Sequence, residues 1–152
     1  MTAAARRAIA DDVRDVWAPR AGTGPVTVLD VGDGGDGLLL AADGHQVVLA
    51  GGSSAGLGRR VDEARLGHRC TVLDALTTAT TRMDLVLAHD VPLTADRVAD
   101  LAMRVRPGGY VSFAGPVARS VDDAARWSVD AGLRMVARRD DGLWHLVVTR
   151  PR

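Results

Sequence analysis

The order of apolar and amphipathic segments constrains this chain most. Short apolar runs occupy 26–31, 46–50, 69–74, 84–88 and 109–115. Because they are apolar throughout, they are typical of strands buried on both faces of a sheet. Segments with helical spacing lie between them, near 37–43, 54–66, 94–105 and 120–131. This alternation predicts an α/β fold, in which right-handed crossovers build a parallel sheet.

The two ends of the chain differ from this pattern. Residues 3–17 predict an amphipathic helix, and the breakers of 19–25 form a linker. Near the other end, two strand-like segments flank Asp140-Asp141-Gly142, which is a hairpin signal. We therefore expect residues 1–25 to form a helix and linker. Residues 26–150 would form one three-layer, Rossmann-like domain of about seven strands, the last one reversed.

Local signals also predict where helices begin and end. Thr94 and Ser120 are expected N-caps, and Pro107-Gly108-Gly109 should stop the preceding helix.

Composition narrows the function classes. The 152 residues include 19 basic side chains, all arginine, and 19 acidic ones, so the formal charge is zero. We therefore expect no nucleic-acid or membrane partner. The absence of lysine excludes Schiff-base and P-loop lysine chemistry. A single cysteine, Cys70, and four scattered histidines predict neither a disulfide nor a metal site. No signal peptide is evident, so we expect a cytoplasmic protein.

The stretch VLDVGDGGDG, residues 28–37, is the main candidate for a ligand loop. Glycines let a backbone approach a ligand closely, and ligands of open α/β sheets lie at the carboxyl ends of the strands. Gly32, Gly34 and Gly37 match the dinucleotide pattern G-x-G-x-x-G. A second glycine-rich segment, 50–60, is similar to that of short-chain dehydrogenases, but the chain lacks their catalytic lysine. A nicotinamide-nucleotide-binding module therefore remains open only without that catalysis.

From Val26 to about Arg150 the sequence resembles class I S-adenosylmethionine-dependent methyltransferases. The matching motifs, in the family's order, are VLDVGDGGDG, CTVLDAL (70–76), MDLVLAHDV (83–91), LAMRVRPGGYVSFAG (101–115) and a closing hairpin. The resemblance implies a seven-stranded sheet with a reversed last strand and S-adenosylmethionine as the cofactor.

The resemblance also assigns roles in the first loop. Asp30, Gly32 and Gly34 match residues that wrap the amino acid part of the cofactor. Asp36 takes the place of the third glycine, so its side chain either meets the cofactor or caps the next helix and faces solvent. Asp33 is a candidate to hold the ribose from the same loop.

The second strand departs from the family where an acid normally binds both ribose hydroxyls. Gly51 stands there, followed by Gly52. Losing this acceptor costs about 1.5–3 kcal/mol, or about tenfold to a hundredfold in affinity. We would expect Gly51→Asp to tighten cofactor binding if the pocket is otherwise intact.

The later motifs supply the remaining candidates. Asp74, Ala75 and Leu76 match residues around the adenine, although Asp74 could equally be a helix N-cap. His89 and Asp90 lie where the family faces the methyl group and its acceptor. His89 is a candidate general base, or else a solvated loop residue.

Three functions follow as hypotheses. The first is a small methyltransferase that binds S-adenosylmethionine and acts on a small molecule. The second is a catalytically silent subunit that serves as a structural or regulatory partner, in a homo- or hetero-oligomer. The third is the NAD(P)-binding module.

Overall fold

The computed structural model describes residues 24–76, 80–116, 121–141 and 143–152, together with Ala4, Arg7 and Asp11. Apart from Ala4, Arg7 and Asp11, the predicted helix over 3–17 lies outside the described residues, as do the predicted N-cap Ser120 and Gly142 of the hairpin.

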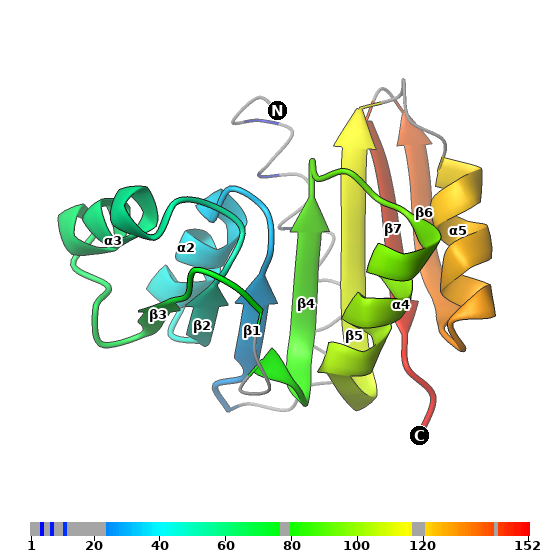
Figure 1. Cartoon of the computed structure of the whole chain (residues 1–152), viewed down its shortest axis with the longest axis horizontal. Coiled ribbons are helices and arrows are strands. Elements are labelled where there is room, and N and C mark those ends of the chain that lie inside the picture. Colours follow the sequence, from blue (N-terminus) through cyan, green and yellow to red (C-terminus); the bar gives the residue numbers. More distant parts are fainter. Residues whose placement is uncertain are drawn as a thin grey trace.

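The described chain forms a seven-stranded sheet between two layers of helices (Figure 1). The strands are β1 (Thr27–Asp30), β2 (Gln46–Leu49), β3 (Cys70–Val72), β4 (Met83–His89), β5 (Val105–Pro116), β6 (Arg134–Asp141) and β7 (Leu143–Thr149). The helices are α2 (Gly35–Ala42), α3 (Ser54–Glu63), α4 (Ala95–Arg104) and α5 (Val121–Asp130). The predicted three-layer α/β fold is therefore confirmed.

The strand order is β3-β2-β1-β4-β5-β7-β6. All neighbouring pairs are parallel except those of β7, which runs antiparallel to both β5 and β6. This confirms the reversed last strand. The chain leaves β1 toward β2 and β3, then returns to place β4 on the other side of β1. The carboxyl ends of β1 and β4 are thus the switch point, where ligands bind in open α/β sheets.

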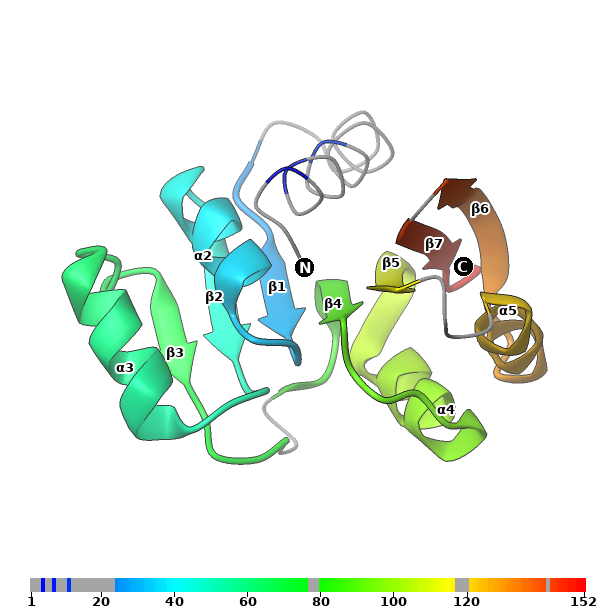
Figure 2. The same ribbon diagram turned by 90° about the horizontal axis from the view of Figure 1, so that it is seen from above.

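Helices cover both faces of the sheet (Figure 2). On one face, α2 and α3 contribute Leu40, Ala41, Leu57 and Val61 to an apolar cluster with β1, β2, β4 and β5. On the other face, α4 and α5 contribute Val98, Leu101, Ala102 and Ala124 to a second cluster. No helix in the described part of the chain is long and apolar enough to cross a membrane.

The helix ends follow the local chemistry. Thr94 caps α4 as predicted, because its side chain accepts a hydrogen bond from the Arg97 N–H at 3.1 Å. Ser53 caps α3 in the same way through Gly56, at 3.2 Å. The predicted stop after α4 is also present, since the helix ends at Arg104. Strand β5, however, begins at Val105, before the predicted start at 109, and pairs there with Met83.

Cys70, the single cysteine, begins β3 and is half-buried against the cluster under α2 and α3. Burial raises the pKa of its thiol.

Candidate functional site

The switch point brings together side chains from four strands. Asp30 ends β1 and His89 ends β4, and β5 and β7 continue the same sheet face with Ser112 and His145. All four side chains lie on the face covered by α2. Asp36, in the first turn of α2, completes the group.

Asp30 organises the loop after β1. Its two carboxylate oxygens accept hydrogen bonds from the N–H groups of Gly32 and Gly37, both at 2.8 Å. Gly37 must lack a side chain here, because a Cβ would lie 2.9 Å from Asp30 Oδ2 and 2.8 Å from the side chain of Leu49. Burial raises the pKa of Asp30, although nearby His89 and the two N–H donors oppose that effect. The folded chain therefore holds a proton on Asp30 more tightly than the unfolded chain does.

The loop then turns into α2 at a residue that must be glycine. Gly34 is the N-cap of α2 and has a φ of 85°, in the left-handed region. No side chain caps the helix, so the expectation that Asp36 caps it is wrong. Asp33 instead accepts a hydrogen bond from Gly35 N–H at 2.8 Å, and Arg60 Nη1 donates to the Asp33 carbonyl at 2.5 Å.

Asp36 does not face solvent, contrary to the same expectation, because only 5% of it is exposed. Its Oδ2 lies 2.9 Å from Nδ1 of His89, which is also only 5% exposed. The expectation of a solvated loop histidine is therefore wrong as well: His89 is the last residue of a buried strand. Each residue thus provides a hydrogen-bond partner for the other in a place where neither can reach bulk water.

The hydrogen bonds continue beyond His89. Its Nε2 lies 2.7 Å from Oγ of Ser112, and that oxygen lies 2.8 Å from Nε2 of His145. The two imidazole rings meet edge to face, 6.0 Å apart. We call Asp36, His89, Ser112 and His145 the polar latch.

The hydrogen-bond donors and acceptors of the polar latch can be assigned from the protons available to each side chain. An ionised Asp36 only accepts, so the shared proton belongs to Nδ1 of His89. A neutral His89 then accepts the Ser112 hydroxyl proton at Nε2, and Ser112 in turn accepts from His145.

The order Asp36–His89–Ser112 matches the connectivity of a nucleophilic triad. However, Ser112 is 0% exposed and its oxygen also contacts His145. A substrate carbonyl cannot reach this hydroxyl, so the arrangement does not support serine-hydrolase chemistry.

The end of β2 does not provide the expected ribose site. Gly51 lies against the loop after β1, where a Cβ would overlap the carbonyl oxygens of Val31 and Gly32. An acid cannot stand at position 51 unless that loop moves. The structure therefore does not support the expectation that Gly51→Asp tightens cofactor binding, since the variant would first have to displace the loop.

The remaining predicted residues lie at the same edge but make no common site. Gly52, Asp74 and Ala75 are exposed, and Leu76 is half-buried. No helix begins at Asp74 among the residues that the structure describes up to position 76, so the N-cap interpretation of Asp74 is not supported.

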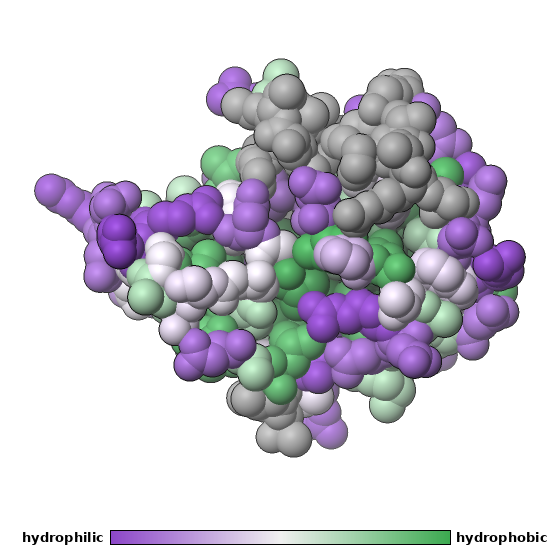
Figure 3. All heavy atoms as spheres, turned by 45° about the horizontal axis from the view of Figure 1, so that its top comes forward, coloured by the Kyte–Doolittle hydropathy of each residue, from purple (hydrophilic) through white to green (hydrophobic). Residues whose placement is uncertain are grey.

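Asp90 is exposed and has a φ of 56°, and its N–H donates to the Ala114 carbonyl at 2.7 Å. Asp90 thus turns the chain out of β4 beside His89. Figure 3, with this edge turned forward, shows hydrophobic atoms at the centre of the face and hydrophilic ones around its rim.

Two members of the polar latch, Ser112 and His145, were not predicted from the sequence. A signal for both was available, because each is a polar residue within an otherwise apolar strand segment. Alternation places Ser112 with Tyr110 and Ala114 on the core side of β5. A polar side chain at such a position requires a partner, but the identity of that partner depends on strands far apart in the sequence.

Two features of the described conformation oppose the binding of an adenosyl cofactor. The place of the third loop glycine is filled by the buried Asp36 carboxylate, which would repel the cofactor's own carboxylate. The place of the ribose acceptor is a glycine packed against backbone. Asp30, Gly32 and Gly34 retain the geometry of the loop.

No family model matches the sequence, and no curated protein does. Solved structures do match. N-methyltransferase NodS from Bradyrhizobium japonicum WM9, in complex with S-adenosylhomocysteine, is 15% identical with a TM-score of 0.76, over 97% of this chain and 87% of that one. The 1,6-didemethyltoxoflavin-N1-methyltransferase of Burkholderia thailandensis is 17% identical with a TM-score of 0.75, over 98% and 79%.

A third match carries a different chemistry. The [4+2]-cyclase SpnF is 16% identical with a TM-score of 0.74, over 93% of this chain and 80% of that one. Methyl transfer is therefore not fixed by this fold. The strand order, the reversed β7 and these similarities together show that the chain has the fold of the class I S-adenosylmethionine-dependent methyltransferases.

Proposed function

We propose that this protein keeps the methyltransferase fold without S-adenosylmethionine-dependent catalysis, and that it serves as a structural or regulatory partner of another protein. The observation that carries the proposal is the buried contact between Asp36 and His89. It closes the edge of the sheet where the family's cofactor would bind, using the residue that replaces the third loop glycine.

A second feature favours the partner role. Between β3 and β4, no α-helix lies among the described residues, 73–76 and 80–82. On the face covered by α4 and α5, Val48 and Ala50 beside this connection are only half-buried. A partner could complete this layer.

The experiment is calorimetric titration with S-adenosylhomocysteine. We expect no heat of binding from the natural sequence at millimolar ligand. Asp36→Gly restores the family's glycine and removes the buried carboxylate, so weak but saturable binding should become measurable. Asp33→Gly is the matched control, because it removes an exposed acid from the same loop and leaves the polar latch intact. It should bind no better than the natural sequence.

The second candidate function is S-adenosylmethionine-dependent methylation of a small molecule. It is favoured by the solved neighbours, two of which are methyltransferases crystallised with S-adenosylhomocysteine. It requires the polar latch to open. Micromolar binding of S-adenosylhomocysteine by the natural sequence would support this second function and overturn the first. Binding of NADPH instead would support the nucleotide-module alternative.

A further inference from the structure

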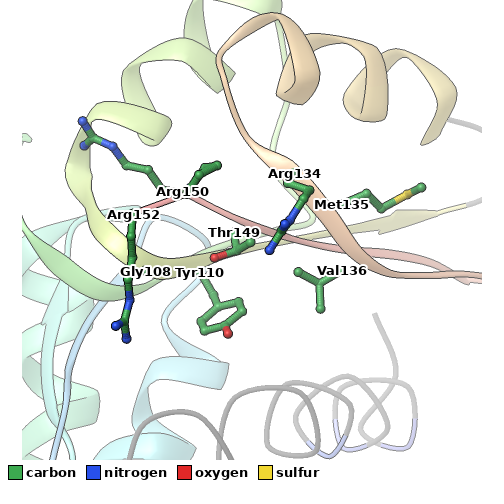
Figure 4. Close-up of a pocket in the computed structure, with 9 residues that line it drawn as sticks. Gly108, Tyr110, Arg134, Met135, Val136, Thr149, Arg150 and Arg152 are labelled. Atoms are coloured by element: carbon green, nitrogen blue, oxygen red, sulfur yellow. The ribbon is translucent and has the colours of Figure 1, made fainter.

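A cavity of about 730 Å³ lies at the opposite edge of the sheet from the polar latch. It is formed by the start of β5, the start of β6 and the end of β7 (Figure 4). Its volume is in the range of small-molecule sites, about 300–1,000 Å³. Neither the candidate site nor the proposed function uses it.

The base of the cavity is polar and lies on two paired strands. Tyr110 and Thr149 are paired residues of β5 and β7, and they are only 8% and 7% exposed. The Thr149 hydroxyl donates to the Gly109 carbonyl at 2.8 Å, which leaves its oxygen able to accept. The Tyr110 hydroxyl makes no hydrogen bond with another described residue, so it can donate to a ligand.

Two arginines flank this base. Arg134 and Arg152 extend toward the same side as the Tyr110 ring, whereas Arg150 points away (Figure 4). Arg150 has a structural contact, since its Nη1 donates to the Val105 carbonyl at 2.9 Å. We call Tyr110, Thr149, Arg134 and Arg152 the arginine basin.

Neither arginine of the arginine basin is paired with an acidic side chain of the described residues. No acidic residue is among those that line the cavity, and neither Arg134 nor Arg152 has an ion pair with a described residue. Other arginines of this protein are paired with aspartates, as are Arg104, Arg106, Arg126 and Arg138. Two guanidinium groups that have no ion pair with a described residue, placed beside a cavity, can bind a negatively charged ligand.

The backbone makes room for one of these arginines. Gly108 has a φ of 79°, and a Cβ there would lie 3.0 Å from Nε and 3.4 Å from Cγ of Arg152. Arg152 therefore lies directly over the bare backbone of Gly108. This contact holds the side chain at the rim of the cavity.

From this geometry we infer that the arginine basin binds a small molecule with two neighbouring anionic groups, such as a diphosphate or a dicarboxylate. Guanidinium groups bind such oxyanions through paired, charge-assisted hydrogen bonds. The hydroxyls of Tyr110 and Thr149 would orient the same ligand from below. The inference is independent of the proposed function, because the two sites occupy opposite edges of the sheet.

The test is calorimetric titration with inorganic pyrophosphate, and separately with citrate, at low ionic strength. We expect saturable binding of one ligand per chain. Arg134→Gln and Arg152→Gln should each weaken binding about tenfold or more, and Tyr110→Phe by a smaller factor. Stronger binding of pyrophosphate or of citrate distinguishes a phosphate ligand from a carboxylate one.

Arg59→Gln is the matched control. Arg59 is exposed on α3, away from the cavity, and has no ion pair with a described residue. It should leave the affinity unchanged. The inference is overturned if neither anion gives saturable binding, or if Arg59→Gln weakens it as much as the two basin variants, which would indicate general attraction to an arginine-rich surface.

Discussion

At the scale of single residues, one hydroxyl joins the two halves of the polar latch. Ser112 contacts Nε2 of both His89 and His145 and is completely buried. Buried polar groups that lose a partner cost more than an average hydrogen bond is worth, because water cannot replace it. Ser112 should therefore matter for stability more than its small size suggests.

Ser112→Ala tests this point. The variant leaves two buried ring nitrogens without a partner, so we expect a loss of about 2–3 kcal/mol in the free energy of unfolding. The measurement is urea denaturation at neutral pH. Ser128→Ala is the control, because Ser128 is equally buried but only donates to the Ala124 carbonyl within α5. Equal losses for the two variants would contradict a special role for Ser112.

At the scale of elements, the loop after β1 and the end of β2 are in direct contact through Gly51. The contact fixes the closed shape of the cofactor edge. It also explains why no acid stands at position 51, a fact that the sequence displays but cannot explain by itself.

A pair of alanine substitutions measures this contact. Gly51→Ala should destabilise the fold by about 1–3 kcal/mol, because its Cβ overlaps backbone atoms that cannot easily move. Gly58→Ala should instead stabilise it by up to about 1 kcal/mol, since position 58 is inside α3 with open space around it. Thermal unfolding compares the two. A tolerated Gly51→Ala would mean that the loop stands away from β2.

The first strand is also tied to β4 at its other end. Asp84 accepts hydrogen bonds from the Thr27 N–H at 2.9 Å and from its hydroxyl at 3.0 Å, and it pairs with Arg106. Burial opposes ionisation of Asp84, but the bonds from Thr27 and Arg106 outweigh it and lower the pKa of the carboxyl.

The lowered pKa of Asp84 predicts a pH dependence. Its contribution to stability is complete above the unfolded-state pKa, about 3.9, and is lost as the pH falls through the lower folded value. Asp84→Asn should cost about 1 kcal/mol at neutral pH, given the partial exposure of the pair. Denaturation across pH 2–7 should show the difference between the proteins shrinking below about pH 4. A constant difference down to pH 2 would contradict this role.

At the scale of the whole molecule, the fold could be predicted and the state of its site could not. The alternation of apolar and amphipathic segments was enough to predict the layers of the fold. A parallel strand that is buried on both faces is apolar at consecutive positions, as in Val26–Val31. The orientation of Asp36 was not visible, because it depends on His89, 53 positions away. Ser112 and His145 come from still later strands. Patterns among neighbouring residues do not indicate which distant residues will be in contact.

The two edges of the molecule have opposite characters. The carboxyl edge of β1 and β4 is closed by buried, hydrogen-bonded groups, whereas the far edge has a cavity beside arginines that have no ion pair with a described residue. We therefore expect ligand binding at the far edge to persist in variants that disrupt the polar latch. Pyrophosphate affinity of Ser112→Ala, measured by calorimetry, should equal that of the natural sequence, and a large loss would contradict the separation of the two edges.

The most direct test of the closed edge is the protonation of the His89 ring, observed in two-dimensional ¹H–¹⁵N NMR spectra of the histidine side chains. We expect a proton on Nδ1, hydrogen-bonded to Asp36, that exchanges slowly with water and whose signal disappears from the spectrum in Asp36→Gly. A His89 ring whose nitrogens exchange freely with solvent, or whose signals are unchanged by Asp36→Gly, would show that the edge is open and contradict the account.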